Sequence, residues 1–145
     1  MKFVELKSKL DREVFPVYVI QGDDRFVCLN AQNIFEKRFA LNYPDINRIV
    51  FDESVTMQEI ISGAMVFPMG DDYRFIEIRD FKTQHEKQDI KLLEEYIKDP
   101  SDQTVILFIN SKESNFFNNI SKKVEVVDCN RLEEKWVVAC IKQNV

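Results

Sequence analysis

The feature that most constrains this sequence is an uninterrupted apolar run, Val105-Ile-Leu-Phe-Ile109, which follows Thr104. Turn-forming residues, Asp99-Pro100-Ser101-Asp102, stand before it. A half-buried strand alternates apolar and polar side chains, whereas a strand without alternation is buried on both faces. Such strands are typical of parallel sheets that carry helices on each side. The run therefore predicts a central strand of an α/β domain.

The rest of the chain alternates between strand-like and helix-like patterns. We predict strands over residues 17–21, 46–51, 73–79, 104–109 and 124–127. We predict helices over residues 2–11, over the segment after the first strand, and over residues 56–65, 86–98 and 132–141. This order predicts a three-layer α/β fold with a mostly parallel sheet of about five strands. We expect residues 1–145 to form a single domain.

Two of the predicted helices carry more detailed signals. The helix after the first strand is expected to turn five side chains inward: Phe26, Cys28, Leu29, Ile34 and Phe35. The helix at residue 56 begins with Thr56-Met57-Gln58-Glu59, a capping box in which the Thr56 hydroxyl and the Glu59 carboxylate each accept from the other's amide.

Composition and charge limit the classes of function. The net charge is −5, and bases are mixed with acids throughout, as in Glu36-Lys37-Arg38. A domain that grips nucleic acid through phosphates usually presents a basic face, so we expect DNA to be contacted only indirectly. No apolar run approaches the roughly 20 residues of a membrane span. Three scattered cysteines, Cys28, Cys129 and Cys140, are typical of buried thiols in a reducing cytoplasm.

The turn Gly22-Asp23-Asp24 follows the first predicted strand and precedes a helix, as a phosphate-binding loop does. Such a loop needs GxxxxGK followed by serine or threonine, and here there is neither lysine nor a second glycine. Two carboxylates at a helix N-terminus satisfy its dipole and oppose phosphate. We therefore expect Asp23 or Asp24 to cap the helix, and we expect no nucleotide or metal cofactor.

An alternative remains open, in which Asp23, Asp24 and Asp80 serve a divergent nucleotide-binding or phospho-receiver domain. A receiver also needs a lysine at the end of the fifth strand, where this chain has Val127-Asp128-Cys129-Asn130. The third predicted strand also carries more charge than a fully buried strand should, with Arg74, Glu77 and Arg79. His85, the only histidine, lies between a strand and a helix in polar surroundings and is expected to be exposed. We expect no catalytic residues.

An apolar turn, Met65-Val66-Phe67-Pro68-Met69, follows the capped helix. Pro68 ends helical structure there, and turns run over the surface. In one interpretation Phe67 packs on the edge of its own domain. In the other Phe67 is an aromatic anchor for a partner's pocket, with Met65 and Met69 as adaptable apolar contacts.

The stretch Pro16-Val-Tyr-Val-Ile-Gln-Gly-Asp-Asp-Arg-Phe-Val27 resembles the opening of the delta subunit of the bacterial DNA polymerase III clamp loader. Family members begin with a short helix and then this kind of strand and acidic turn. Three further stretches agree in order and spacing: Phe51-Asp52-Glu53, residues 57–79, and residues 92–97 leading through Pro100 into the apolar run. Leu132-Glu-Glu-Lys-Trp-Val137 resembles the lead into the family's second domain.

The resemblance implies an AAA+ (RecA-like) fold in which Gly22, Asp23 and Asp24 form a degenerate phosphate loop. It implies a non-catalytic subunit that binds the sliding clamp (beta subunit) of DNA polymerase III and opens its ring during replication. The family's contact is an apolar pair, typically leucine and phenylalanine, at the end of the helix before the third strand. Carried over, the pair falls on Val66 and Phe67, with Met65 beside them; valine here replaces leucine, and Pro68 follows.

The family's two further domains, the last of which joins other clamp-loader subunits, are absent from residues 1–145. We therefore expect a fragment of a longer subunit, with residues 132–145 leading toward a second domain. A third hypothesis is a purely structural module that docks on other loader subunits.

Overall fold

The computed structural model describes residues 1–112, 115–118, 120 and 123–130. Its five strands are β1 (Val17–Gln21), β2 (Arg48–Phe51), β3 (Arg74–Arg79), β4 (Thr104–Asn110) and β5 (Val124–Asp128). They form one sheet in the order β2-β3-β4-β1-β5, and every neighbouring pair is parallel. The apolar run lies in β4, at the centre of the sheet, so the prediction of a five-stranded parallel sheet is confirmed.

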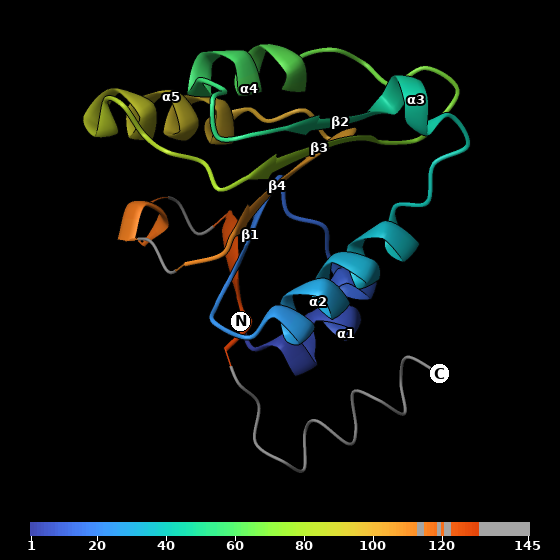
Figure 1. Cartoon of the computed structure of the whole chain (residues 1–145). Helices are drawn as coiled ribbons and strands as arrows, with labels where there is room; N and C mark the ends of the chain where they lie inside the picture. The colour runs from blue at the N-terminus through green and yellow to red at the C-terminus, as the bar shows by residue number, and fades with distance from the viewer. Residues whose placement is uncertain (113–114, 119, 121–122, 131–145) are drawn as a thin grey trace.

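Helices cover both faces of this sheet (Figure 1). The short helix η1 (Phe3–Glu5), α1 (Leu6–Arg12) and α2 (Arg25–Arg38) belong to one face, and α4 (Met57–Ala64) and α5 (Glu86–Lys98) to the other. The remaining helices are α3 (Pro44–Asn47) and η2 (Asn115–Phe117). The three-layer prediction is confirmed, while the predicted helix over residues 132–141 lies outside the described residues. No helix in the described part of the chain is long and apolar enough to cross a membrane.

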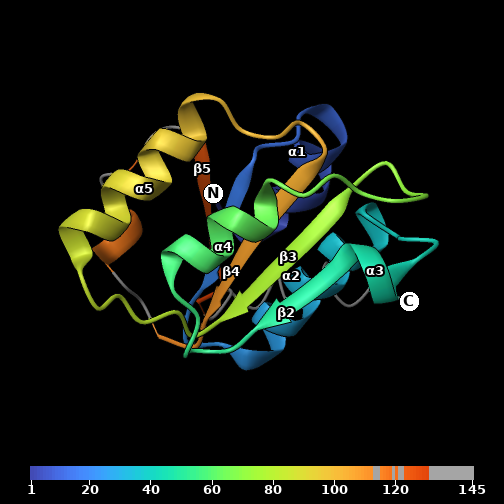
Figure 2. The ribbon, with the colours of Figure 1, turned by 90° about the horizontal axis from the view of Figure 1, so that it is seen from above.

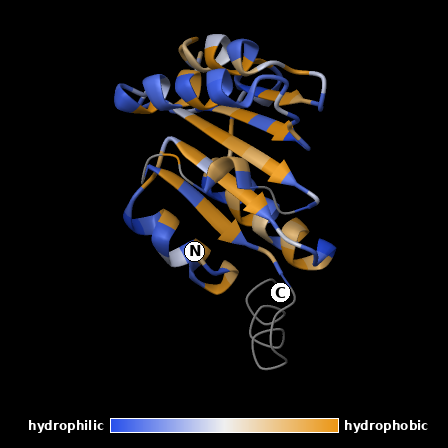
Figure 3. Ribbon diagram, turned by 90° about the vertical axis from the view of Figure 1, so that its left-hand side faces the viewer, coloured by the Kyte–Doolittle hydropathy of each residue, from blue (hydrophilic) through white to orange (hydrophobic). Residues whose placement is uncertain are grey.

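The sheet separates two hydrophobic cores, and β4 serves both of them. Val105 and Leu107 pack with α1 and α2, whereas Ile106 and Phe108 pack with α4 and α5. This explains why the run does not alternate: each of its side chains enters one apolar core or the other. Figure 3 shows the largely apolar strands between helices that carry polar residues.

Helix α2 buries Cys28 and Phe35, as predicted, but exposes two of the other predicted core side chains. Phe26 and Leu29 are 54% and 48% exposed, so the prediction that they turn inward is wrong. The buried stripe is Val27, Ala31 and Phe35, each four residues from the last. Because α2 carries apolar residues on more than one face, hydrophobicity alone did not identify the side that meets the sheet.

The predicted second strand is shorter than expected, because residues 44–47 form helix α3 instead. Pro44 occupies the first turn of this helix, where its fixed φ angle favours helix and its missing amide costs nothing. Strand β2 therefore begins at Arg48 rather than Ile46.

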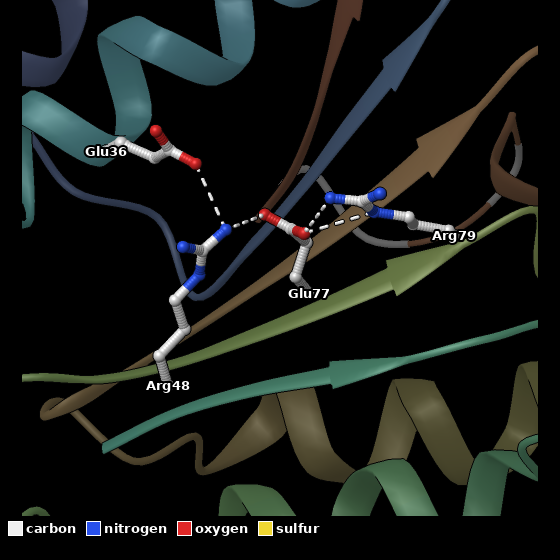
Figure 4. A network of polar contacts seen from close by, with 4 residues as sticks. All are labelled: Glu36, Arg48, Glu77 and Arg79. Atoms are coloured by element: carbon white, nitrogen blue, oxygen red, sulfur yellow. Dashed lines mark hydrogen bonds and ion pairs between the residues drawn. The ribbon is translucent and has the colours of Figure 1, made fainter. Parts of the chain in front are cut away.

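Strand β3 buries two of its charged residues, Arg74 and Glu77, contrary to the sequence-based expectation that it was too charged for a buried strand. The Glu77 side chain is 1% exposed and lies between two arginines (Figure 4). Arg48 Nη2 lies 3.2 Å from Glu77 Oε1, and Arg79 Nη2 lies 3.0 Å from Glu77 Oε2. Arg48 Nη2 also lies 3.0 Å from Glu36 Oε1 on α2. Pairing with two cations offsets the cost of burying the carboxylate.

Candidate functional site

Helix α4 is fixed at its start and against the sheet. The Glu59 amide donates to Thr56 Oγ1 at 3.2 Å, and the Thr56 amide donates to Glu59 Oε1 at 3.3 Å, so the predicted capping box is confirmed. Met57, Ile60 and Ala64 are buried in the core that α4 shares with α5. The packing of α4 therefore fixes where the helix ends, and the apolar turn begins at the next residue, Met65.

The turn after α4, residues 65–69, exposes its large apolar side chains. Met65, Val66, Phe67 and Met69 are 61%, 50%, 71% and 66% exposed. The interpretation in which Phe67 packs on the edge of its own domain is therefore wrong for this structure. Contiguous apolar side chains left exposed on a folded domain mark an interaction surface.

Buried polar groups hold the end of α4 in place. The Arg74 guanidinium donates from Nε to the Gly63 carbonyl at 2.9 Å and from Nη1 to the Ile46 carbonyl at 3.2 Å. Thr104 Oγ1 donates to the Ala64 carbonyl at 3.1 Å. Arg74 and Thr104 are both buried, and desolvation lowers the pKa of Arg74. These bonds help to satisfy the carbonyls at the C-terminal end of α4, where the Gly63 carbonyl also accepts from the Val66 amide at 3.4 Å.

Asn47 holds the far end of the turn. Its side chain, fully buried, accepts from the Met69 amide at 2.8 Å and donates to the Met69 carbonyl at 2.8 Å. It also donates to Asp71 Oδ2 at 2.8 Å, and Asp71 accepts from the amides of Asn42 and Tyr43 at 2.7 and 2.9 Å. Desolvation raises the pKa of Asp71, but these hydrogen bonds outweigh it and leave the pKa below its usual range.

The turn is thus fixed on its polar side and exposed on its apolar side. Arg74 and Thr104 anchor the carbonyls before it, and Asn47 anchors Met69 within it. A surface held in this way loses little conformational entropy when a partner binds, which favours affinity. Sequence reasoning missed Asn47, Arg74 and Asp71. Their only signals in the sequence were an arginine at the start of a largely apolar strand and an asparagine three residues after a proline.

The Gly22 turn lies at the opposite edge of the sheet and has its amides satisfied internally. The Asp23 amide donates to Asn130 Oδ1 at 3.0 Å, and the Asp24 amide donates to the Cys129 carbonyl at 3.2 Å. Asp24 Oδ1 accepts from the Val27 amide at 3.1 Å and caps α2, which confirms the predicted cap. A Cβ atom at Gly22 would lie 2.3 Å from the Cys129 carbonyl carbon, so the segment after β5 occupies the space beside the turn.

The three aspartates of the alternative hypothesis do not converge on a metal site. Among the described residues, no group of three or more His, Cys, Asp or Glu side chains could hold a metal ion. Asp80 Oδ1 instead accepts from the amide and hydroxyl of Ser111 at 2.9 and 2.8 Å, which links the ends of β3 and β4. His85 is exposed, as predicted. Cys28 and Cys129 are buried free thiols, also as predicted, whereas Cys140 lies outside the described residues.

Comparison with known proteins gives the following relatives. The model of the family described as DNA polymerase III, delta subunit, matches residues 18–130. No curated protein matches. The Bacillus subtilis DNA clamp loader delta protein (YqeN) superposes with a TM-score of 0.75 at 20% identity, over 94% of this chain and 45% of that one. A gamma subunit-related protein of DNA polymerase III from Thermotoga maritima gives a TM-score of 0.61 at 16% identity, over 92% and 47%.

The chain therefore spans less than half of the length of either solved structure. At these identities the superpositions establish a shared fold, and the match of the family model extends over most of the chain.

Proposed function

Because this chain belongs to the DNA polymerase III delta subunit family, we propose that it binds the sliding clamp and opens the clamp's ring for loading onto DNA. The observation that carries this proposal is the exposed apolar turn at the end of α4. A domain of this size with ample buried core has no structural need to leave Phe67, Met65 and Met69 in water.

In the proposed contact, Phe67 is the anchor that enters an apolar pocket of the clamp, and Val66 and Met65 pack beside it. Full burial of a large apolar side chain contributes about 1.5–3 kcal/mol. Met69, whose backbone is held by Asn47, supplies an adaptable apolar contact next to the anchor.

Opening requires a second contact, because a ligand shifts an equilibrium only by its differential affinity for the two states. We assign this role to α4 (Met57–Ala64), which presses against the clamp near a subunit interface once Phe67 is seated. The anchor fixes the position, and contacts that only the opened ring makes stabilise the open state.

The proposal includes no catalytic step in this domain. The amides of Asp23, Asp24 and Val27 at the Gly22 turn donate to groups of the protein itself, which leaves them occupied where a phosphate would need donors. We therefore propose that ATP hydrolysis in the complex takes place in other subunits and that this domain takes no cofactor.

We further propose that the domain acts as part of a longer subunit, with residues 132–145 leading to a second domain. Contacts with other clamp-loader subunits would come from those additional domains, in the cytoplasm. DNA would be contacted only indirectly, in keeping with the net charge of −5.

The test is a titration of the purified clamp with the wild-type domain and with Phe67→Ala. The substitution should weaken binding by at least ~2 kcal/mol, which is about 30-fold in Kd, because an anchor in a desolvated pocket dominates such an interface. The matched control is Phe26→Ala, which removes an equally large, 54% exposed ring from α2. Equal affinity of Phe67→Ala and wild type would refute the assignment of the site.

A further inference from the structure

Helix α3 and the residue just before it, Tyr43, place two more apolar side chains beside the turn. Tyr43 and Ile46 are 54% and 50% exposed. Figure 2 shows α3 next to the loop that follows α4. The Arg74 guanidinium joins the two segments, since it donates to carbonyls of both Gly63 and Ile46. Asn47, the last residue of α3, pairs with both backbone polar groups of Met69.

The Tyr43 ring lies against Gly70, the residue that follows the turn. A Cβ atom built on Gly70 would come within 2.7 Å of Tyr43 Cε2, so only glycine permits this approach. Gly70 also has a φ angle of +78°, a conformation that glycine adopts without cost. The exposed surface of Tyr43 therefore adjoins that of Met69. Together with α3, it extends the apolar surface beyond the side chains around Phe67.

Carboxylates border this enlarged surface. Asp45 on α3 and Asp72 after the turn are exposed, and so is Asp102 in the loop before β4. The loop of Asp102 is close, since the Arg74 amide donates to the Gln103 carbonyl at 2.7 Å. None of the three carboxylates has a salt-bridge partner within the described ranges of the chain. Arg74, the cation at this edge of β3, is buried and donates to carbonyls.

We propose that Tyr43 and Ile46 complete one docking surface with the apolar turn, and that Asp45 and Asp72 select a clamp pocket bordered by lysine or arginine. The inference rests on the proposed function and adds the chemistry of its partner surface. An apolar centre with a charged border is the usual plan of a specific interface, in which the border sets orientation and the rate of association. The negative charge on this border favours a partner surface that carries positive charge.

The first test is a titration of the clamp at several salt concentrations with Asp45→Asn/Asp72→Asn, which removes two charges and keeps the shape. At about 0.05 M salt we expect binding about three- to tenfold weaker than wild type. Near 1 M salt the difference should vanish, because the screening length falls to about 3 Å. The control, Asp11→Asn/Glu86→Gln, makes the same change in net charge on α1 and α5, and it should bind like wild type.

The second test is Ile46→Ala, which shortens the exposed apolar side chain on α3 and should weaken binding about three- to tenfold at every salt concentration. If Phe67→Ala weakens binding while Ile46→Ala and the aspartate pair match wild type, the inference is overturned and the proposed function stands. If the aspartate pair and its control weaken binding equally, the net charge explains the loss of affinity. The proposed role of Asp45 and Asp72 is then refuted. If the wild-type domain does not bind the clamp, both proposals fail.

Discussion

Two turns at opposite edges of the sheet make an instructive comparison. The Gly22 turn follows β1 at the carboxyl edge, and the turn of residues 65–69 precedes β3 at the amino edge. Both have backbone polar groups satisfied by neighbouring segments: Cys129 and Asn130 serve the first, and Asn47 the second. They differ in the side chains they leave in water.

The difference teaches that satisfied backbone groups do not by themselves indicate a function. The Gly22 turn presents an exposed carboxylate, Asp23, and the segment after β5 fills the space beside it. The turn of residues 65–69 presents four large apolar side chains on a rigid base. Only the second turn leaves a cluster of apolar side chains in water, and a partner that buries them would gain favourable free energy.

The largest expected effect concerns the crowding of the Gly22 turn. Gly22→Ala would place its Cβ atom 2.3 Å from the Cys129 carbonyl carbon and should lower the free energy of unfolding by about 3 kcal/mol. Gly63→Ala is the matched control, because its Cβ atom would make an ordinary 3.5 Å contact with Ile76 Cδ1. In helix α4 that change should stabilise by about 0.5–1 kcal/mol.

Urea denaturation of both glycine variants measures these free energies. Equal stability of Gly22→Ala and Gly63→Ala would show that the segment after β5 moves aside readily, and the contrast between the two turns would be lost.

The next effect concerns the support of the apolar turn. Asn47→Ala leaves the Met69 amide and carbonyl without their buried partner and should lower the free energy of unfolding by about 2–3 kcal/mol. Asn33→Ala, at an exposed position on α2, should change it by less than about 0.5 kcal/mol. If Asn47→Ala unfolds at the wild-type urea concentration, the turn does not depend on this side chain.

The sequence predicted the strands, most of the helices and the apolar turn after α4, because these follow from local patterns. It predicted them where one pattern dominates, as in the run of β4 or the Thr56–Glu59 capping box. It failed where several patterns compete. Helix α2 carries apolar residues on more than one side, and only the sheet decides that Val27 rather than Phe26 is buried.

The polar supports of the site were beyond sequence reasoning for a similar reason. The sequence marks Glu77 and Arg74 as charged, and charged residues are rarely buried without partners. Their partners, Arg48 and the carbonyls of Ile46 and Gly63, are distant along the chain and become neighbours only through folding. The turn at Pro68 was predictable from the proline, whereas the exposure of Phe67 and the hydrogen bonds that hold the turn were not.

The smallest expected effect is the response of the apolar turn to acid. The pKa of Asp71 lies below its ordinary value of 3.8, so its bonds stabilise the turn fully above that pH and are lost as pH falls through the lower, folded-state value. The NMR signals of the Asn42 and Tyr43 amides should shift with a midpoint below 3.8.

Asp71→Asn should abolish this acid transition, and Asp72→Asn, one residue away, should keep it. A transition that persists in Asp71→Asn would assign the titration to another group.

The strand order has a consequence for how the chain is made. Among the five strands of this sheet β1 is synthesised first, but both of its partners, β4 and β5, begin only at Thr104 and Val124. Its fully buried Val17, Val19 and Ile20 therefore remain without a sheet to join until most of the chain has been synthesised. Such long-range closure slows folding and leaves an apolar strand open to aggregation, so production of this domain should depend on temperature and on chaperone supply.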